Sequence, residues 1–298
     1  MQKISVKGQV YSDIIYLEAE NVSIYYEYFF TDATLPTMVV LAGGPGFGLD
    51  LYKPQVEAFQ SQANILLFDP FGCGQSSRAE NIEDYTINKT MDVAAALIKK
   101  LGELHYFKKA IIHGTSYGGI AALGFAIKYP ELTAGLIIVS GTTSYHFLEL
   151  AKAKIKVIGN EAQVALCENY LWPGRFDENS AEAFFQHMTP IYAKSVTEVT
   201  ENPYASSCAI SVTNQAFKNE YDHFDWTPDL HKITCPVLIL AGRYDWITPP
   251  ELVEIIPEKI KHAMLTIFEE AGHALFKDAP GQYKKEITGF LNKFAVCF

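Results

Sequence analysis

A serine between two glycines could supply a nucleophile in this chain. Ser116 is the centre of a Gly-x-Ser-x-Gly pattern that follows a short apolar run at 110–112 and precedes a helical pattern at 120–129. A serine on so tight a turn projects its hydroxyl above a sheet, and Gly114 and Gly118 remove side chains that would clash there. The helix that follows points its backbone N–H groups at the same spot. The pattern predicts a nucleophilic serine rather than a plain glycine-rich loop.

The hydroxyl of Ser116 needs a base, and His273 is the candidate. A serine hydroxyl is a weak nucleophile until a neighbouring base takes its proton. Of the eight histidines, His273 lies in a loop just past the last predicted strand, from which it can reach back over the sheet. His113 lies inside the strand that leads to Ser116, and we interpret it as structural. The other six lie in helical or polar surroundings, which favours surface or cap positions.

A histidine base needs a carboxylate that fixes its tautomer and stabilises its charged form. Asp245 follows the predicted strand at 237–241 and is the candidate acid. The chain order serine, aspartate, histidine is one of the known orders for such a triad. The segment 140–143, after the strand that ends near residue 139, could also hold the acid but contains none. Asp69 ends another strand, and its glycine-rich sequel indicates that it organises a loop.

Acyl transfer also needs donors for the negative charge that develops on the carbonyl oxygen. The backbone N–H of Tyr117 is one candidate, because it directly follows the nucleophile. The second candidate is Gly44, in the glycine-rich loop 43–46 after the predicted strand at 38–41. The glycines allow a substrate to approach the backbone closely, and Pro45 stiffens the turn. We therefore expect Gly44 and Tyr117 to form an oxyanion hole.

Short apolar runs alternate with helical patterns along most of the chain, which predicts an α/β fold. The predicted strands are residues 22–30, 38–41, 65–68, 110–112, 136–139, 237–241 and 263–268, and the predicted helices are residues 90–101, 120–129 and a last helix over 283–294. Such alternation indicates a mostly parallel sheet with helices on both faces. Ligands bind at the carboxyl ends of the strands in these sheets, and all the candidate residues above lie at such ends.

The alternation of short apolar runs with helical patterns stops between residues 143 and 226. This segment lacks buried strand runs, shows helical periodicity around 147–155, and carries aromatic residues scattered among polar ones. We interpret it as a helical cap inserted into the core. The predicted organisation is a core of residues 1–142 and 227–298 with a cap of residues 143–226.

Composition narrows the classes of partner. The formal net charge is −10 with a sequence pI of about 5.3, and an acidic surface repels phosphate backbones, so we expect no nucleic-acid partner. Five cysteines without paired spacing predict neither a disulfide framework nor a zinc site. No leader-like start and no long apolar stretch is present, which favours a cytoplasmic protein without membrane association. The expected ligand is a small molecule or a short peptide.

Together these motifs resemble the α/β-hydrolase superfamily, and most closely the proline iminopeptidase group. The motifs that carry the resemblance are the 43–46 loop, the 69–76 stretch, the 114–119 turn, residues 242–245, and Gly272 with His273. The resemblance implies an eight-stranded sheet with a helical cap inserted after the sixth strand. It also implies cleavage of N-terminal residues, often proline, from peptides, without a metal or cofactor.

Three positions depart from the peptidase pattern. Ala42 stands where the family usually has histidine, before Gly43 of the predicted substrate pocket. Trp246 and Asn214 stand where the peptidases have glutamates that bind the substrate's ammonium group. A buried ammonium without a carboxylate is costly. Trp246 in the pocket instead favours an uncharged acyl group, although three nearby acids could replace the missing glutamates: Glu220, Asp222 and Asp225.

The sequence thus predicts a serine hydrolase that cleaves a small amide or ester through an acyl-enzyme. A carboxylesterase acting on an uncharged acyl group is the alternative within that chemistry. A non-catalytic ligand-binding protein on the same fold is a further alternative, which the complete triad disfavours. A dehalogenase or epoxide hydrolase would need an aspartate in place of Ser116.

Overall fold

The computed structural model describes residues 8–196 and 208–294. The N-terminal residues used above to argue against a leader, and Cys297, lie outside the described residues. Of the other cysteines, Cys73, Cys167, Cys208 and Cys235 are all free thiols.

The centre of the molecule is an eight-stranded sheet in the order β1-β2-β4-β3-β5-β6-β7-β8. β1 pairs with β2, and β2 with β4, in antiparallel fashion, whereas all the other neighbours are parallel. The strands are β1 (Gln9–Leu17), β2 (Val22–Phe30), β3 (Thr37–Leu41), β4 (Asn64–Phe68), β5 (Ala110–Thr115), β6 (Thr133–Val139), β7 (Val237–Gly242) and β8 (Ala263–Phe268). The prediction of a mostly parallel sheet is confirmed.

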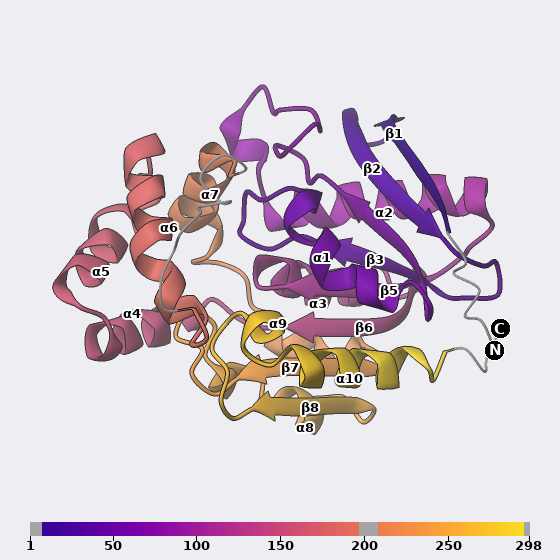
Figure 1. Cartoon of the computed structure of the whole chain (residues 1–298). Coiled ribbons are helices and arrows are strands. Elements are labelled where there is room, and N and C mark those ends of the chain that lie inside the picture. Colours follow the sequence, from indigo (N-terminus) through magenta and orange to yellow (C-terminus); the bar gives the residue numbers. More distant parts are fainter. Residues whose placement is uncertain (1–7, 197–207, 295–298) are drawn as a thin grey trace.

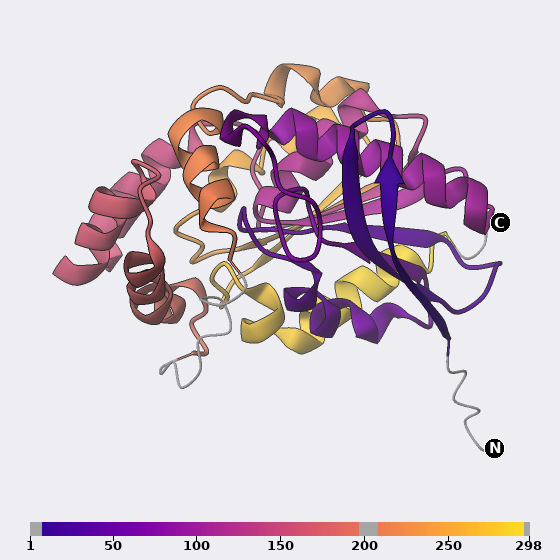
Figure 2. The ribbon, with the colours of Figure 1, turned by 90° about the horizontal axis from the view of Figure 1, so that it is seen from above.

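Helices cover both faces of this sheet (Figures 1 and 2). One face carries α2 (Ile87–His105), α3 (Tyr117–Lys128) and α8 (Ile256–Lys259), and the other carries α1 (Lys53–Val56), α9 (Leu275–Asp278) and α10 (Pro280–Leu291). Short helical turns complete the core: η1 (Leu49–Leu51), η2 (Glu57–Phe59), η3 (Ile82–Asp84), η6 (Thr227–Lys232) and η7 (Pro250–Leu252). Two hydrophobic clusters result, one on each side of the sheet.

The central strands were predictable because every residue of β3, β4, β5 and β7 is buried. Strands buried on both faces read as continuous apolar runs. β1 was not predicted from the sequence. It is an edge strand, and most of its residues are exposed or half-exposed, so its apolar signal is weak.

The two long core helices begin earlier than their periodicity suggests. α2 begins at Ile87 because the Thr86 side chain caps it, accepting a hydrogen bond from the Lys89 N–H at 2.9 Å. α3 begins at Tyr117, immediately after Ser116, and ends at Lys128, just before Pro130. The start of α3 at this position brings its N-terminal backbone donors next to the serine.

The loop after β4 is organised by Asp69, as predicted. Its buried carboxylate accepts the Leu49 N–H at 2.8 Å and the Gln75 N–H at 2.7 Å. A side chain at Gly74 would collide with that carboxylate, which explains the glycine there. Asp69 therefore ties the 43–51 loop to the 70–77 loop.

Between β6 and η6 the described chain is helical and forms a layer beside the carboxyl ends of the strands (Figure 1). Its elements are α4 (Phe147–Ile158), α5 (Glu161–Leu166), η4 (Cys167–Leu171), α6 (Glu178–Tyr192), α7 (Ile210–Gln215) and η5 (Ala216–Glu220). The two ends of this segment meet at an antiparallel bridge between Ser144 and Asp225. We call the segment 143–226 the cap, and its division from the core remains an interpretation.

Candidate active site

Ser116 lies on the sharp turn between β5 and α3, with φ of 57° and ψ of −119°. Such a positive φ is strained for a residue with a side chain, and strain of this kind gathers at functional sites. A Cβ at Gly114 would collide with the Gly118 carbonyl oxygen, and a Cβ at Gly118 with the Leu41 carbonyl oxygen. The turn therefore needs glycine on both sides of the serine, as the sequence pattern predicts.

Asp245 and His273 form a hydrogen-bonded pair at the ends of β7 and β8. His273 Nδ1 lies 2.8 Å from Asp245 Oδ2. The carboxylate is fully buried, and its Oδ1 accepts the backbone N–H groups of Ile247 at 3.0 Å and Thr248 at 2.9 Å. These bonds fix the carboxylate, which in turn can fix the tautomer of the imidazole.

Two hydroxyl residues that sequence reasoning missed make hydrogen bonds around this pair. Thr248 Oγ1 donates to Asp245 Oδ2 or to the Ser140 carbonyl oxygen, both at 2.8 Å, and lies 3.2 Å from His273 Nδ1. Ser140 Oγ donates to the His273 carbonyl oxygen at 2.7 Å. The loops after β6, β7 and β8 are thus tied together beneath the imidazole. The only sequence signal was a hydroxyl residue three positions after the aspartate.

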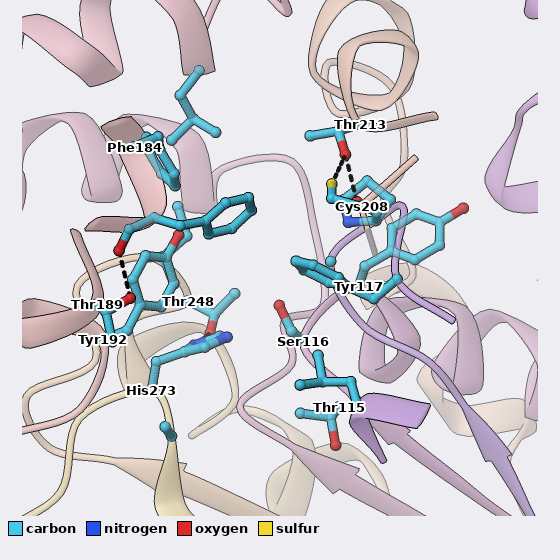
Figure 3. A pocket seen from close by; sticks show the side chains of 18 of the residues that line it. Thr115, Ser116, Tyr117, Phe184, Thr189, Tyr192, Cys208, Thr213, Thr248 and His273 are labelled. Atoms are coloured by element: carbon cyan, nitrogen blue, oxygen red, sulfur yellow. Dashed lines mark hydrogen bonds between the residues drawn. The ribbon is translucent and has the colours of Figure 1, made fainter. Parts of the chain in front are cut away.

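Ser116 and His273 line one cavity and face each other across it (Figure 3). The described part of the chain holds no hydrogen bond between Ser116 Oγ and the His273 ring. Catalytic hydrogen bonds are often long in the absence of substrate and tighten in the complex. Ser116 and His273 therefore face the same space, and His273 is hydrogen-bonded to the buried Asp245.

The candidate oxyanion donors also lie at this cavity. Gly44 and Tyr117 both line it, and the Tyr117 N–H belongs to the first residue of α3. The neighbouring Gly43 N–H already donates to Tyr52 Oη at 2.6 Å. Gly44 is therefore the better placed of the two glycines for a donor role, as the sequence interpretation expects.

The cap holds the loop that carries Gly44. Thr213 Oγ1, in α7, donates to the Pro45 carbonyl oxygen at 2.6 Å. The Ala209 N–H donates to the Gly46 carbonyl oxygen at 2.7 Å. A side chain at Gly46 would collide with these partners, which explains the glycine. The geometry of the candidate oxyanion hole thus depends on cap residues.

The cavity measures about 160 Å³ and lies between the strand ends and the cap. Most of the side chains that line it are aromatic or aliphatic, including Phe147, Leu171, Phe176, Phe184, Phe217 and Phe276. Lys277 and His273 are the basic side chains that line it among the described residues. No aspartate or glutamate lines it within residues 8–196 and 208–294. The space fits an uncharged apolar group.

The three predicted pocket residues lie elsewhere. Trp246 is fully buried behind the cavity wall, where its ring meets that of Tyr192 at 5.3 Å. Asn214 bonds both backbone groups of Phe176 at 2.8 Å within the cap. Gly43 is not among the residues that line the cavity, and its N–H donates to Tyr52 Oη, as described above. The position of Asn214 depends on the register of the cap helices, which counting along a sequence cannot give.

The acids that could replace the missing glutamates have other roles. Glu220 Oε2 accepts the Ile87 N–H at 3.0 Å and so caps α2. Asp225 accepts the Thr227 N–H at 2.9 Å at the base of the cap, and Asp222 is exposed. None of the three lines the cavity.

His113 is structural, as predicted. It is fully buried, and its Nε2 lies 3.3 Å from Tyr283 Oη of α10. Burial lowers the pKa of His113 from 6.5 to about 4. The group therefore stays neutral at physiological pH.

Two structural features are absent from the described residues. No helix there is long and apolar enough to cross a bilayer. No group of three or more histidine, cysteine, aspartate or glutamate side chains there is arranged to hold a metal ion.

Several relatives match the chain over most of its length. It is 27% identical over 285 residues to a proline iminopeptidase of Saccharolobus solfataricus, covering 92% of this chain and 90% of that protein. It is 31% identical over 274 residues to the proline iminopeptidase PfmaB of Pestalotiopsis fici, covering 87% and 92%. A putative carbamate hydrolase RutD of Caulobacter sp. is 25% identical over 90% of this chain and 96% of its own.

Solved structures match the fold. An alpha/beta fold family hydrolase from Bacillus anthracis superposes with a TM-score of 0.76 at 20% identity, covering 96% of this chain and 99% of that one. The proline iminopeptidase of Mycobacterium smegmatis superposes with a TM-score of 0.70 at 18% identity, covering 96% and 99%. The family model for the alpha/beta hydrolase fold matches residues 36–280. The chain therefore belongs to the α/β-hydrolase family and resembles its proline iminopeptidase group.

Proposed function

We propose that this protein is a serine hydrolase that cleaves a small amide or ester through an acyl-enzyme on Ser116. The observation that carries the proposal is the convergence of Ser116, on its strained turn, and His273, bonded to buried Asp245, on one cavity. Each part of a nucleophile, base and acid is present with its supporting bonds. A structural serine would not need the strained turn or the paired glycines around it.

The reaction uses groups of this chain and one water molecule. Ser116 Oγ attacks the carbonyl carbon while its proton passes to His273 Nε2. The oxyanion that forms accepts hydrogen bonds from the backbone N–H groups of Gly44 and Tyr117. The bond to the leaving nitrogen or oxygen then breaks, and the leaving group takes the proton from His273. Water next attacks the acyl carbon, gives a proton to His273, and that proton returns to Ser116 Oγ as the acid leaves.

The relatives favour an aminopeptidase-like amide substrate, as in proline iminopeptidases. A second candidate is an esterase acting on an uncharged acyl group, because no acidic side chain of the described residues lines the cavity. An ammonium group placed there would lack the carboxylate partner that offsets its desolvation. The two candidates share the chemistry at Ser116 and differ in the charge of the substrate.

The test of the chemistry is covalent labelling. The wild-type protein should react with a serine-directed aryl phosphonate and lose activity, whereas Ser116→Ala should neither react nor hydrolyse p-nitrophenyl esters. Ser144→Ala, which alters a buried serine at the base of the cap, is the matched control and should label normally. A folded wild-type protein that resists the label would overturn the assignment of Ser116.

The test of the substrate compares proline p-nitroanilide with its N-acetylated form and with short p-nitrophenyl esters. An aminopeptidase prefers the free amine strongly. An esterase of the second kind hydrolyses the esters faster and gains nothing from the free amine.

A further inference from the structure

Two tyrosines that line the cavity, Tyr192 and Tyr221, have hydroxyls without a hydrogen-bond partner among the described residues. Tyr221 is only 3% exposed. In the described part of the chain neither hydroxyl makes a hydrogen bond, and neither oxygen is among the unpartnered polar atoms sealed inside the protein. Both hydroxyls are therefore available to a bound molecule.

Most other polar side chains around the cavity already make hydrogen bonds within the protein. Thr189 Oγ1 donates to the Phe185 carbonyl oxygen at 2.5 Å, Thr213 is bonded to Pro45, and Tyr117 Oη pairs with Thr90 at 2.9 Å. Gln55 Oε1 and Thr115 Oγ1 lack partners but are sealed from the cavity. Apart from the candidate catalytic groups, the two tyrosine hydroxyls are the free donors that this space offers within the described residues.

The two rings stand on either side of the nucleophile. The Tyr192 ring meets the His273 ring edge to face at 5.3 Å, and Figure 3 shows it beside the histidine. The Tyr221 ring meets the Tyr117 ring at 6.3 Å. One ring therefore lies beside the candidate base, and the other lies beside the ring of the residue that follows Ser116. An acyl group on Ser116 that extends into the cavity can approach both tyrosines, because both line it.

The chemistry of a buried phenol selects the group that it binds. Burial raises the pKa of Tyr192 and of Tyr221 well above the ordinary value, so both remain protonated donors. A purely alkyl group would cover them and leave both O–H groups unpaired, which costs free energy. A neutral carbonyl oxygen accepts from a phenol without bringing a charge into the apolar cavity.

We infer that Tyr192 and Tyr221 recognise an uncharged carbonyl oxygen on the acyl part of the substrate, so that an oxoacyl ester or amide is preferred over a plain alkanoyl one. This inference rests on the proposed acyl transfer at Ser116. It adds a substrate class to that function, namely acyl groups that carry a second carbonyl beyond the scissile one.

A binding experiment tests the inference without any turnover. Levulinamide and pentanamide differ by one ketone, and their affinities for Ser116→Ala protein are measured by calorimetry. Adding Tyr221→Phe or Tyr192→Phe to Ser116→Ala should lower the ratio of the two affinities roughly threefold to tenfold, the loss expected for one neutral hydrogen bond. Adding Tyr106→Phe, which alters a residue that is 95% exposed, should leave the ratio as it was.

The inference is overturned if neither Phe substitution changes the ratio, or if Tyr106→Phe changes it as much. Its failure is separable from failure of the proposed function, because amide binding to Ser116→Ala needs no nucleophile. For the wild-type enzyme, p-nitrophenyl levulinate and pentanoate should show the same ratio change in kcat/KM. Loss of phosphonate labelling in the wild-type protein would count against Ser116 and not against the tyrosines.

Discussion

The loops at the strand ends and the cap meet at one cavity but are held by different forces. In the strand-end loops, hydrogen bonds dominate. Asp245 Oδ1 accepts two backbone N–H groups, and Oδ2 lies within hydrogen-bond distance of Thr248 Oγ1 and His273 Nδ1. Ser140 Oγ donates to the His273 carbonyl oxygen. In the cap wall, ring contacts dominate, such as Tyr221 against Phe217 at 4.7 Å. Hydrogen bonds are directional and ring packing is much less so. The chemistry is therefore positioned by one region, whereas the shape available to the substrate is decided by the other.

The largest expected effect comes from the centre of the polar network. Asp245→Asn keeps the side-chain oxygen that accepts two backbone N–H groups, but it no longer holds His273 in the tautomer needed for a base. We expect kcat for an ester to fall roughly 10⁴-fold, the size seen when such an aspartate becomes asparagine in another serine hydrolase. Thermal unfolding measured beside the rate checks that the variant is folded.

Asp13→Asn, on the exposed strand β1, is the control for Asp245→Asn and should leave kcat unchanged. If Asp245→Asn kept more than a tenth of the wild-type kcat, the polar network would not be what positions the chemistry.

The next effect comes from Thr248, which lies beside the acid and the base. Thr248→Val keeps the shape but removes the donor, which leaves either Asp245 Oδ2 or the Ser140 carbonyl oxygen one hydrogen bond short. A buried hydrogen bond lost in this way corresponds to roughly a tenfold to hundredfold lower kcat. Thr248→Ser restores the hydroxyl and should restore most of the rate. Equal rates for the Val and Ser variants would show that Thr248 acts only by packing.

A smaller effect is expected where the two regions join. Thr213→Val removes the bond from the cap to the Pro45 carbonyl oxygen, which loosens the loop that carries Gly44. The oxyanion donor remains but is less well placed, so we expect kcat to fall roughly threefold to tenfold with little change in KM. Thr213→Ser is the matched control. A change confined to KM would indicate that Thr213 shapes the cavity and does not support the oxyanion loop.

The smallest effect on kcat is expected for a change in β5, at His113, which we expect to act on stability alone. His113 has a pKa of about 4 in the folded protein against 6.5 when exposed, so the unfolded chain binds its proton first as pH falls. The contribution of this residue to stability is complete above pH 6.5 and is lost progressively towards pH 4. The unfolding free energy falls, through this residue, by at most about 1.4 kcal/mol per pH unit.

Urea unfolding between these two pH values measures that loss. His113→Gln cannot gain a proton and should show a shallower fall of the unfolding free energy, whereas His231→Gln, at an exposed turn, should follow the wild-type protein. Parallel curves for the wild-type protein and His113→Gln would contradict the neutral buried histidine.

Much of the core was predictable because burial on both faces of a parallel sheet leaves a continuous apolar signal. β1 was not predicted because an edge strand with exposed residues lacks that signal. The placing of Ser116, Asp245 and His273 at one edge of the sheet was predictable because each lies in a loop after a strand, and parallel strands present their carboxyl ends at one edge. Thr248 and Ser140 were not, because a hydroxyl in a loop has no sequence pattern that marks it as a hydrogen-bond partner.

The sequence by itself determined the strand ends, the glycines that permit the Ser116 turn, and the chain order of the candidate nucleophile, acid and base. These depend on local backbone sterics and on apolar runs, which neighbouring residues specify. Only the tertiary structure decided which side chains enclose the cavity. It placed Trp246 behind the wall and Asn214 inside the cap, and it left the hydroxyls of Tyr192 and Tyr221 open. Cap helices pack through side chains far apart in the chain, so their register follows from the assembled fold and not from spacing.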